Sequence, residues 1–286
     1  MDKKLIKKLF GVDYLPKINL NLREISTAAQ KMAGKLSISG VQPKLSLRLN
    51  RKKKELEVTD IGGEYILKPQ TEIFPNLPQN EHLFMNIASR LNIEVPPNML
   101  IKLKDKSLAY IVKRFDRIKG EKLHQEDFCQ ILGEKNKYNG SCEKIGKKLK
   151  EVSDIPGLDT QLFFERILFF FIIGNGDAHL KNFSIIYDKK MHKRLSPAYD
   201  ILSSKLVIAD EEDLALALNG KKNNINKKDF EILAETLKIT TKVSYRNILG
   251  KINSIDLSIK NSIMSTEEKK KLLTITKERG SRLGVY

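Results

Sequence analysis

The chain has 286 residues, of which 41% are hydrophobic and 30% charged. This length and composition predict a folded protein with a sizeable core and exclude a disordered chain and a fibrous repeat. A net charge of +17 favours an anionic partner such as nucleotide or nucleic acid, although lysines spread along the whole chain are equally typical of a solvated surface.

The two cysteines, Cys129 and Cys142, form no CxxC pair or Cys/His cluster, which excludes structural zinc and indicates a reducing compartment. The N-terminal segment MDKKLIKKLF lacks the apolar core and cleavage site of a secretory signal. The longest apolar run, 162–173, contains Glu165 and Arg166 and is shorter than the ~20 residues of a membrane span. We therefore expect a cytoplasmic protein without a membrane partner, and a buried helix over this run.

Alternating apolar and polar residues predict β-strands in the first part of the chain. The predicted strands are KLSLRLN from position 44, LEVTD, EYILKP, MLIKLK and LAYIVKRFD, which ends at position 116. Between the third and fourth strands a helix is predicted over 80–92, with Asn80 as its N-cap. Residues 15–22 are predicted as a strand or an extended arm.

After position 116 the pattern becomes helical. Helices are predicted in EDFCQILG, SCEKIGKKLKEV, LDTQLFFERILFFFIIG and most of 228–284, with one β-like stretch over 183–187 and an exposed loop over 220–228. The sequence thus predicts an α+β protein, with a β-rich domain over residues 1–115 and a helical domain over 116–286.

The polar segment GNGDAHLKNF carries the residues best suited to chemistry. Asp177 precedes Asn182 by five positions, and Asp200 ends the second arm of a predicted hairpin built from FSIIY and RLSPAYD. Protein kinases use this arrangement, in which the first Asp receives the acceptor's proton while the Asn and the second Asp bind Mg²⁺ through oxygen. The D-x4-N spacing alone is common by chance. The predicted hairpin and Asp200 make the kinase interpretation considerably stronger.

A kinase also needs a strand lysine that holds the ATP phosphates. Lys68 ends the apolar strand EYILKP, although a strand-end lysine also reaches solvent in an ordinary core. Glu81, in the following predicted helix, is the predicted partner of Lys68, although an acidic residue there also suits the helix dipole.

Three further segments fit a nucleotide site. The turn around Ser37, Ser39 and Gly40 suits a phosphate-covering loop, although one glycine is equally consistent with a plain turn. VKRFD is predicted as the hinge at the adenine ring. His179 and Lys181 are predicted to bring positive charge near the γ-phosphate.

In this order, the motifs SGVQPK, YILKP, NEHLFMNIA, VKRFDR, HQEDFCQ, NGDAHLKNFS and LSPAYDI resemble the HipA family of bacterial serine/threonine kinases, the toxins of HipBA-type toxin–antitoxin systems. The resemblance runs from about Ser37 to Ser204. It implies a two-lobed, protein-kinase-like fold with a β-rich N-lobe and a helical C-lobe, and an active site in the cleft between them. It also implies ATP and Mg²⁺ as cofactors and a protein serine or threonine as acceptor.

Carried over motif by motif, the resemblance implies that Asp177 is the catalytic residue, Asn182 and Asp200 are the Mg²⁺ ligands, and Lys68 is the phosphate-binding lysine. The ATP-binding residues that it implies are Ser39, Gly40, Val41, Gln42, Pro43, Lys44, Lys68, Lys113, Arg114, Phe115, His179, Leu180, Lys181, Asn182, Tyr199 and Asp200.

The stretch ahead of Ser37 is too short for the extra subdomain of full-length HipA proteins, so the layout looks like the HipT toxins of HipBST systems. That resemblance implies autophosphorylation of Ser37 and Ser39, a HipS-like small protein and a HipB-like DNA-binding antitoxin as partners, and an aminoacyl-tRNA synthetase as target. Direct nucleic-acid contact is compatible with the charge but not required. Two alternatives stay open: a small-molecule kinase, which would label no protein, and a catalytically idle kinase-like binding module, which would show salt-dependent nucleic-acid binding.

Overall fold

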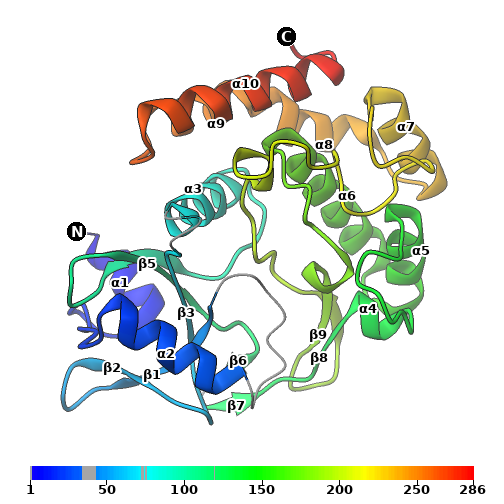
Figure 1. The fold of residues 1–286 in the computed structure, drawn as a ribbon. Helices are drawn as coiled ribbons and strands as arrows, with labels where there is room; N and C mark the ends of the chain where they lie inside the picture. Colours follow the sequence, from blue (N-terminus) through cyan, green and yellow to red (C-terminus); the bar gives the residue numbers. More distant parts are fainter. Residues whose placement is uncertain (1, 34–42, 72–73, 75, 119) are drawn as a thin grey trace. The chain divides into compact units, whose positions relative to one another are not determined.

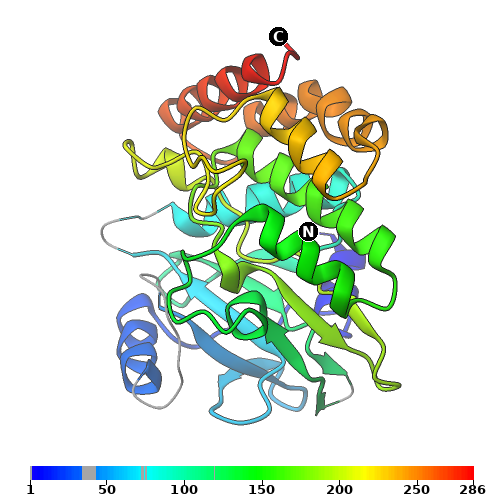
Figure 2. The same ribbon diagram turned by 90° about the vertical axis from the view of Figure 1, so that its right-hand side faces the viewer.

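The computed structural model describes residues 2–33, 43–71, 74, 76–118 and 120–286. They form two compact units (Figures 1 and 2). Unit 1 comprises Met1–His82 and Pro96–Lys122, and unit 2 comprises Leu83–Val95 and Leu123–Tyr286. Unit 1 is built on a β-sheet and unit 2 is mainly helical, while the predicted domain boundary at 115 stays a prediction.

Unit 1 contains the five predicted strands. They are β1 (Leu45–Asn50), β2 (Glu55–Val58), β3 (Tyr65–Pro69), β4 (Asn98–Lys102) and β5 (Leu108–Lys113). They pair antiparallel in the order β2-β1-β3-β5-β4. The short strands β6 (Arg117–Ile118) and β7 (Glu121–Lys122) form a separate hairpin.

The sheet of unit 1 has two different faces because side chains alternate along each strand. One face packs against α1 (Lys3–Phe10) and α2 (Leu22–Ala33), drawn in blue in Figure 1, and this core includes Leu47, Leu67 and Ile111. Leu67 pairs with Ile111 across β3 and β5, so the next pair, Lys68 and Tyr110, lies on the opposite face. The register thus separates the predicted phosphate-binding lysine from the apolar core.

Two expectations for this part of the chain need correction. Residues 15–22, predicted as a strand or an extended arm, form no strand: residues 15–21 are irregular apart from an isolated bridge between Lys17 and Glu55, and Leu22 begins α2. The helix predicted over 80–92 is α3 (Leu77–Arg90), which starts a turn earlier. Asn80 is therefore not an N-cap, because its backbone N–H already donates to the carbonyl of Asn76 as part of the first turn.

Unit 2 is assembled around α6, the apolar helix that the sequence predicts. Besides residues 83–90 of α3, its helices are α4 (Phe128–Ile131), α5 (Cys142–Val152), α6 (Pro156–Ile173), α7 (Lys227–Thr236), α8 (Thr241–Ile248), α9 (Ile252–Lys260) and α10 (Thr266–Arg282). All five phenylalanines of α6 are buried, and α6 packs against α5, α8 and α10. In the part of the chain that the structure describes, no helix is long and apolar enough to cross a membrane.

A small sheet in unit 2 carries the predicted hairpin. Its strands are β8 (Gln125–Asp127), β9 (Ser184–Tyr187) and β10 (Lys193–Leu195), in the order β10-β9-β8. β9 confirms the predicted stretch over 183–187, but β10 ends at Leu195. Asp200 therefore lies beyond the hairpin rather than at the end of its second arm.

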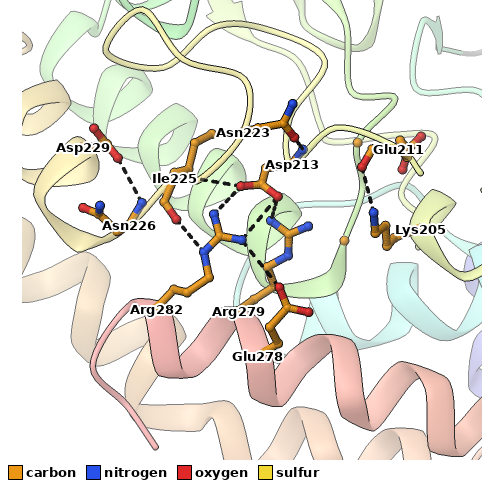
Figure 3. A network of polar contacts seen from close by, with 12 residues as sticks. Lys205, Glu211, Asp213, Asn223, Ile225, Asn226, Asp229, Glu278, Arg279 and Arg282 are labelled. Carbon is orange, nitrogen blue, oxygen red and sulfur yellow. Dashed lines mark hydrogen bonds and ion pairs between the residues drawn. The ribbon is translucent and has the colours of Figure 1, made fainter. Parts of the chain in front are cut away.

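A buried ionic network anchors the loop that follows Asp200 (Figure 3). Asp213 forms ion pairs with Arg279 and Arg282 of α10, and its carboxylate also accepts the backbone N–H of Ile225 at 3.0 Å. Both guanidinium groups lie over the ring of Phe171 in α6. Ile225 is buried where this network holds it. The rest of the loop over 220–228, which the sequence predicts to be exposed, is exposed apart from the half-buried Lys222.

Candidate functional site

The segment Gly174–Asn182, which we call the catalytic loop, begins where α6 ends in a left-handed glycine, Gly174 (φ 67°). The loop is folded back on itself: the N–H of His179 donates to the Asn182 Oδ1 atom at 3.0 Å, and the N–H of Asn182 donates to the His179 carbonyl at 2.9 Å. Asp177 is exposed and Asn182 is half-buried. The two residues that the sequence predicts as proton acceptor and metal ligand therefore share one tightly hydrogen-bonded loop.

Tyr138, which sequence reasoning missed, contacts the catalytic loop. Its hydroxyl donates to the Asp177 Oδ1 atom at 2.7 Å, and its ring lies edge-on to His179 with centroids 5.3 Å apart. Nothing in the sequence distinguishes this tyrosine from others in polar loops, because the contact joins residues 39 positions apart.

Tyr199 holds the segment before Asp200 to the same loop. Its hydroxyl donates to the Lys181 carbonyl at 2.8 Å and lies 2.5 Å from the Ser184 hydroxyl. Asp200 itself is half-buried and has a left-handed backbone (φ 55°), a conformation that Asp tolerates better than most residues. The negative charge of Asp200 acts on His179, so these two side chains lie within electrostatic range of each other.

The structure corrects the predicted positive charge at His179. The side chain is buried, and burial, followed by the positive charge of Lys137, lowers the pKa of His179 to about 4. The imidazole is therefore neutral near neutral pH. The other predicted positive group, Lys181, lies in the same loop with a half-buried side chain. Its role near the γ-phosphate stays a prediction.

Glu211 is a second residue that the sequence did not reveal. The Ser204 hydroxyl oxygen accepts a hydrogen bond from the backbone N–H of Gly176 at 2.9 Å. The same hydroxyl donates to the Glu211 Oε2 atom at 2.6 Å. A Cβ at position 176 would lie 2.5 Å from the Glu211 Oε2 atom and from the Glu212 carbonyl, so only glycine fits there. Burial raises the pKa of Glu211 to about 7, with the nearby Asp177 charge acting in the same direction.

We expect Glu211 to make stability depend on pH near neutrality. The raised pKa means that the folded state holds this proton more tightly than the unfolded state, so the stabilisation is complete below the usual pKa of 4.5 and is lost as pH rises from there through about 7. After allowing for solvent screening of a half-exposed group, we expect roughly 1–2 kcal/mol to be lost. Urea unfolding at pH 5.5 and 8 should show this loss in the wild type and in Glu212→Gln but not in Glu211→Gln; an unchanged pH dependence in Glu211→Gln would contradict it.

In unit 1, the predicted partnership of Lys68 and Glu81 is confirmed. The Lys68 ammonium lies 2.5 Å from the Glu81 Oε1 atom, with the two residues only 3% and 1% exposed. The ammonium also lies 5.6 Å from the centroid of the Tyr110 ring. A buried ion pair costs desolvation and adds little net stability, so core packing alone does not account for a lysine at this position.

The predicted hinge follows β5. The backbone N–H groups of Lys113 and Arg114 donate to the carbonyls of Pro97 and Glu64, so a contact with adenine would use other backbone groups of this segment, which includes Phe115. The Arg114 guanidinium forms a two-point hydrogen bond with Asp116 at 2.9 and 2.7 Å. The arginine side chain is therefore held within unit 1.

Most of the predicted phosphate loop lies outside the described residues. The residues concerned are Ser37, Ser39, Gly40, Val41 and Gln42. Pro43 and Lys44 are described; both are half-buried and lead directly into β1.

Within the described residues, no group of three or more His, Cys, Asp or Glu side chains is arranged to hold a metal. Protein sites for Mg²⁺ commonly supply only one or two carboxylates and leave the remaining positions to phosphates and water. The Asp200 carboxylate and the Asn182 amide oxygen are hard donors that fit this ion. Their role as ligands stays a prediction.

Comparison with known proteins extends these observations. The family model for the HipA-like C-terminal domain matches residues 36–258. A putative kinase of Haemophilus influenzae is 34% identical over 202 residues, covering 66% of this chain and 58% of the relative. The serine/threonine-protein kinase toxin HipA of Shewanella oneidensis is 30% identical over 209 residues, covering 65% of this chain and 47% of the relative. The chain spans about half the length of the curated relatives it matches.

Two solved structures resemble this one. The HipA chain of the Shewanella oneidensis complex of HipA, HipB and operator DNA gives a TM-score of 0.69 at 24% identity, covering 86% of this chain and 64% of that chain. The Helicobacter pylori proinflammatory kinase CtkA gives 0.58 at 18% identity, covering 80% and 89%. These similarities confirm the predicted α+β, kinase-like fold. The closer affinity to HipT toxins stays a prediction.

Proposed function

Because this chain belongs to the family of HipA-like C-terminal domains, we propose that it is a protein kinase that transfers the γ-phosphate of ATP to a serine or threonine hydroxyl. In this proposal Lys68 is the phosphate-binding group and Asp177 the proton acceptor. Asn182 and Asp200 would be the oxygen ligands for Mg²⁺.

In the proposed reaction, Asp177 orients the acceptor hydroxyl and takes its proton while the hydroxyl oxygen bonds to the γ-phosphorus and the bond from that phosphorus to the β–γ bridging oxygen breaks. When bound, Mg²⁺ would neutralise the charge of the phosphates. Lys68 would hold the phosphates by charge, and Glu81 keeps the lysine side chain in place at 2.5 Å. Asp177 suits its role because its side chain is exposed and its Oδ1 atom is already hydrogen-bonded.

The observation that supports this proposal most strongly is the buried Lys68–Glu81 pair. It joins a strand residue to a helix residue 13 positions away, as expected for a kinase and at an energetic cost that core packing alone does not require. Phosphoryl transfer requires this lysine charge, whereas binding to another macromolecule does not, so the pair favours an active enzyme over an idle binding module.

We further propose a wider role as the toxin of a bacterial toxin–antitoxin system. The similarity to a HipA solved with HipB and operator DNA supports a HipB-like DNA-binding antitoxin as partner. From the resemblance of the motifs we add a HipS-like small protein as a second partner, an aminoacyl-tRNA synthetase as acceptor, and Ser37 and Ser39 as sites of self-phosphorylation.

The test is incubation of the purified protein with γ-labelled ATP, alone and with a bacterial lysate, followed by intact-mass and peptide mass spectrometry. We expect Mg²⁺-dependent phosphate on serine or threonine of a protein, lost with EDTA and restored by excess Mg²⁺. Label on Ser37 or Ser39 would establish self-phosphorylation as well. Label only on small molecules would instead identify a small-molecule kinase, and no label on any product would contradict the proposal.

A further inference from the structure

Tyr138 fixes one oxygen of the predicted proton acceptor. Its hydroxyl donates to the Asp177 Oδ1 atom at 2.7 Å. Among the residues that the structure describes, the other oxygen of Asp177, Oδ2, has no hydrogen-bond partner, and the side chain is exposed. The carboxylate thus has one oxygen held by a protein hydrogen bond and one without such a partner, on an exposed side chain.

The segment Asn136–Gly140, which we call the tyrosine loop, is itself fixed on the catalytic loop. The N–H of Leu180 donates to the Lys137 carbonyl at 3.0 Å. Gly140 packs so closely that a Cβ there would lie 2.7 Å from a methyl carbon of Leu180. Within the loop, the N–H of Tyr138 donates to the Asn136 side chain at 2.9 Å. The tyrosine is therefore held by its backbone as well as by its hydroxyl.

The protonation state of the pair also suits a fixed hydrogen bond. Burial and the hydrogen bond to Asp177 raise the pKa of Tyr138 above its usual value of 10, so its hydroxyl remains a donor at physiological pH. The terminal torsion of an aspartate is broad in the absence of such a contact. A hydrogen bond to one carboxylate oxygen restricts this torsion angle and thereby fixes the direction of the other oxygen.

We propose that Tyr138 is a positioning residue for phosphoryl transfer, which holds Oδ1 of Asp177 so that Oδ2 accepts the proton of the acceptor hydroxyl. This inference rests on the proposed kinase function. Positioning of a catalytic group before the reaction lowers the barrier without strengthening the binding of ATP. Removal of the Tyr138 hydroxyl should therefore slow transfer and leave the apparent KM for ATP unchanged.

The matched control is Tyr286, whose hydroxyl donates to an Asp256 carboxylate oxygen at 2.6 Å. The two tyrosines are similarly exposed, 39% for Tyr138 and 46% for Tyr286, so Tyr138→Phe and Tyr286→Phe each remove one Tyr–Asp hydrogen bond of the same kind. Phenylalanine also preserves the ring that contacts His179. A difference in rate between the two variants then measures the effect of the Tyr138 hydroxyl on Asp177.

The experiment measures the rate of protein phosphorylation against ATP concentration for the wild type and both variants, with melting temperatures alongside. We expect Tyr138→Phe to lower the maximal rate by about 10-fold with KM for ATP unchanged, and Tyr286→Phe to match the wild type. Wild-type rates in Tyr138→Phe would overturn the positioning role, and a faster rate would show instead that the hydroxyl blocks the acceptor. If the wild type and Tyr286→Phe also transferred nothing, the proposed function itself would have failed.

Discussion

We expect Asp213→Asn to lower the free energy of unfolding by about 3–5 kcal/mol, because it leaves the buried Arg279 and the partly buried Arg282 without their counterion. Asp213 pairs with both Arg279 and Arg282, and Arg279 is only 2% exposed. Burial alone would raise the pKa of Asp213, but its hydrogen bonds and the two arginines hold that pKa below the usual value of 3.8. This contribution to stability is therefore present above about pH 4 and is lost as pH falls through the folded-state pKa.

Urea unfolding at pH 7 measures the effect, with Glu278→Gln as the control. Glu278 lies 3.6 Å from the Arg282 guanidinium, but its side chain is 60% exposed, so its removal should change stability by no more than about 1 kcal/mol. The same network fixes Ile225 through the Arg282 Nε atom, which donates to the Ile225 carbonyl at 2.8 Å. A loss in Asp213→Asn as small as in Glu278→Gln would show that the arginines find other partners or water.

The strands of unit 1 were predictable because their signal is local. In β1, alternate residues such as Leu45 and Leu47 are buried while Arg48 is exposed, which is the two-residue period seen in the sequence. The helix α1 was not predicted although its apolar residues lie on one face, because its eight residues are fewer than the ~11–18 over which a helical period is usually judged. Its stability comes from burial of Leu9 and Phe10 against the sheet, which is a tertiary effect.

The residues of the candidate site also differ in whether local sequence reveals them. Asp177 and Asn182 were predictable from their spacing in one loop, and Lys68 with Glu81 from their places on adjacent elements. Tyr138 was not, because only folding brings the loop after α4 onto the catalytic loop.

Properties that depend on burial were equally hidden. The sequence suggests a charge at His179, whereas its buried position makes the imidazole neutral. Glu211 reads as one of several acids in a polar loop until its contact with Ser204 is seen. Residue types predict which chemistry is available, but protonation states require the surroundings of each side chain.

Asp177→Asn and Asp200→Asn should each reduce phosphoryl transfer by more than about 10³-fold while the protein stays folded. Asparagine is the informative substitution at both sites. At Asp177 it preserves an oxygen that accepts the Tyr138 hydroxyl, and at Asp200 it tolerates the left-handed backbone at φ 55°. Loss of activity then reports the missing negative charge rather than a disturbed backbone.

Binding of ATP distinguishes the two roles. Asp177→Asn should bind Mg²⁺-ATP with wild-type affinity, because the predicted proton acceptor acts only on the acceptor hydroxyl, whereas Asp200→Asn should bind it more weakly because a predicted metal ligand has lost its charge. Asp188→Asn, in the exposed turn between β9 and β10, is the control and should match the wild type in both measurements. Transfer by Asp177→Asn within 10-fold of the wild-type rate would remove this residue from the proton-accepting role. Equal ATP affinity in all three variants would remove Asp200 from the proposed metal site, because loss of a ligand's charge should weaken the binding of Mg²⁺ and therefore of Mg²⁺-ATP.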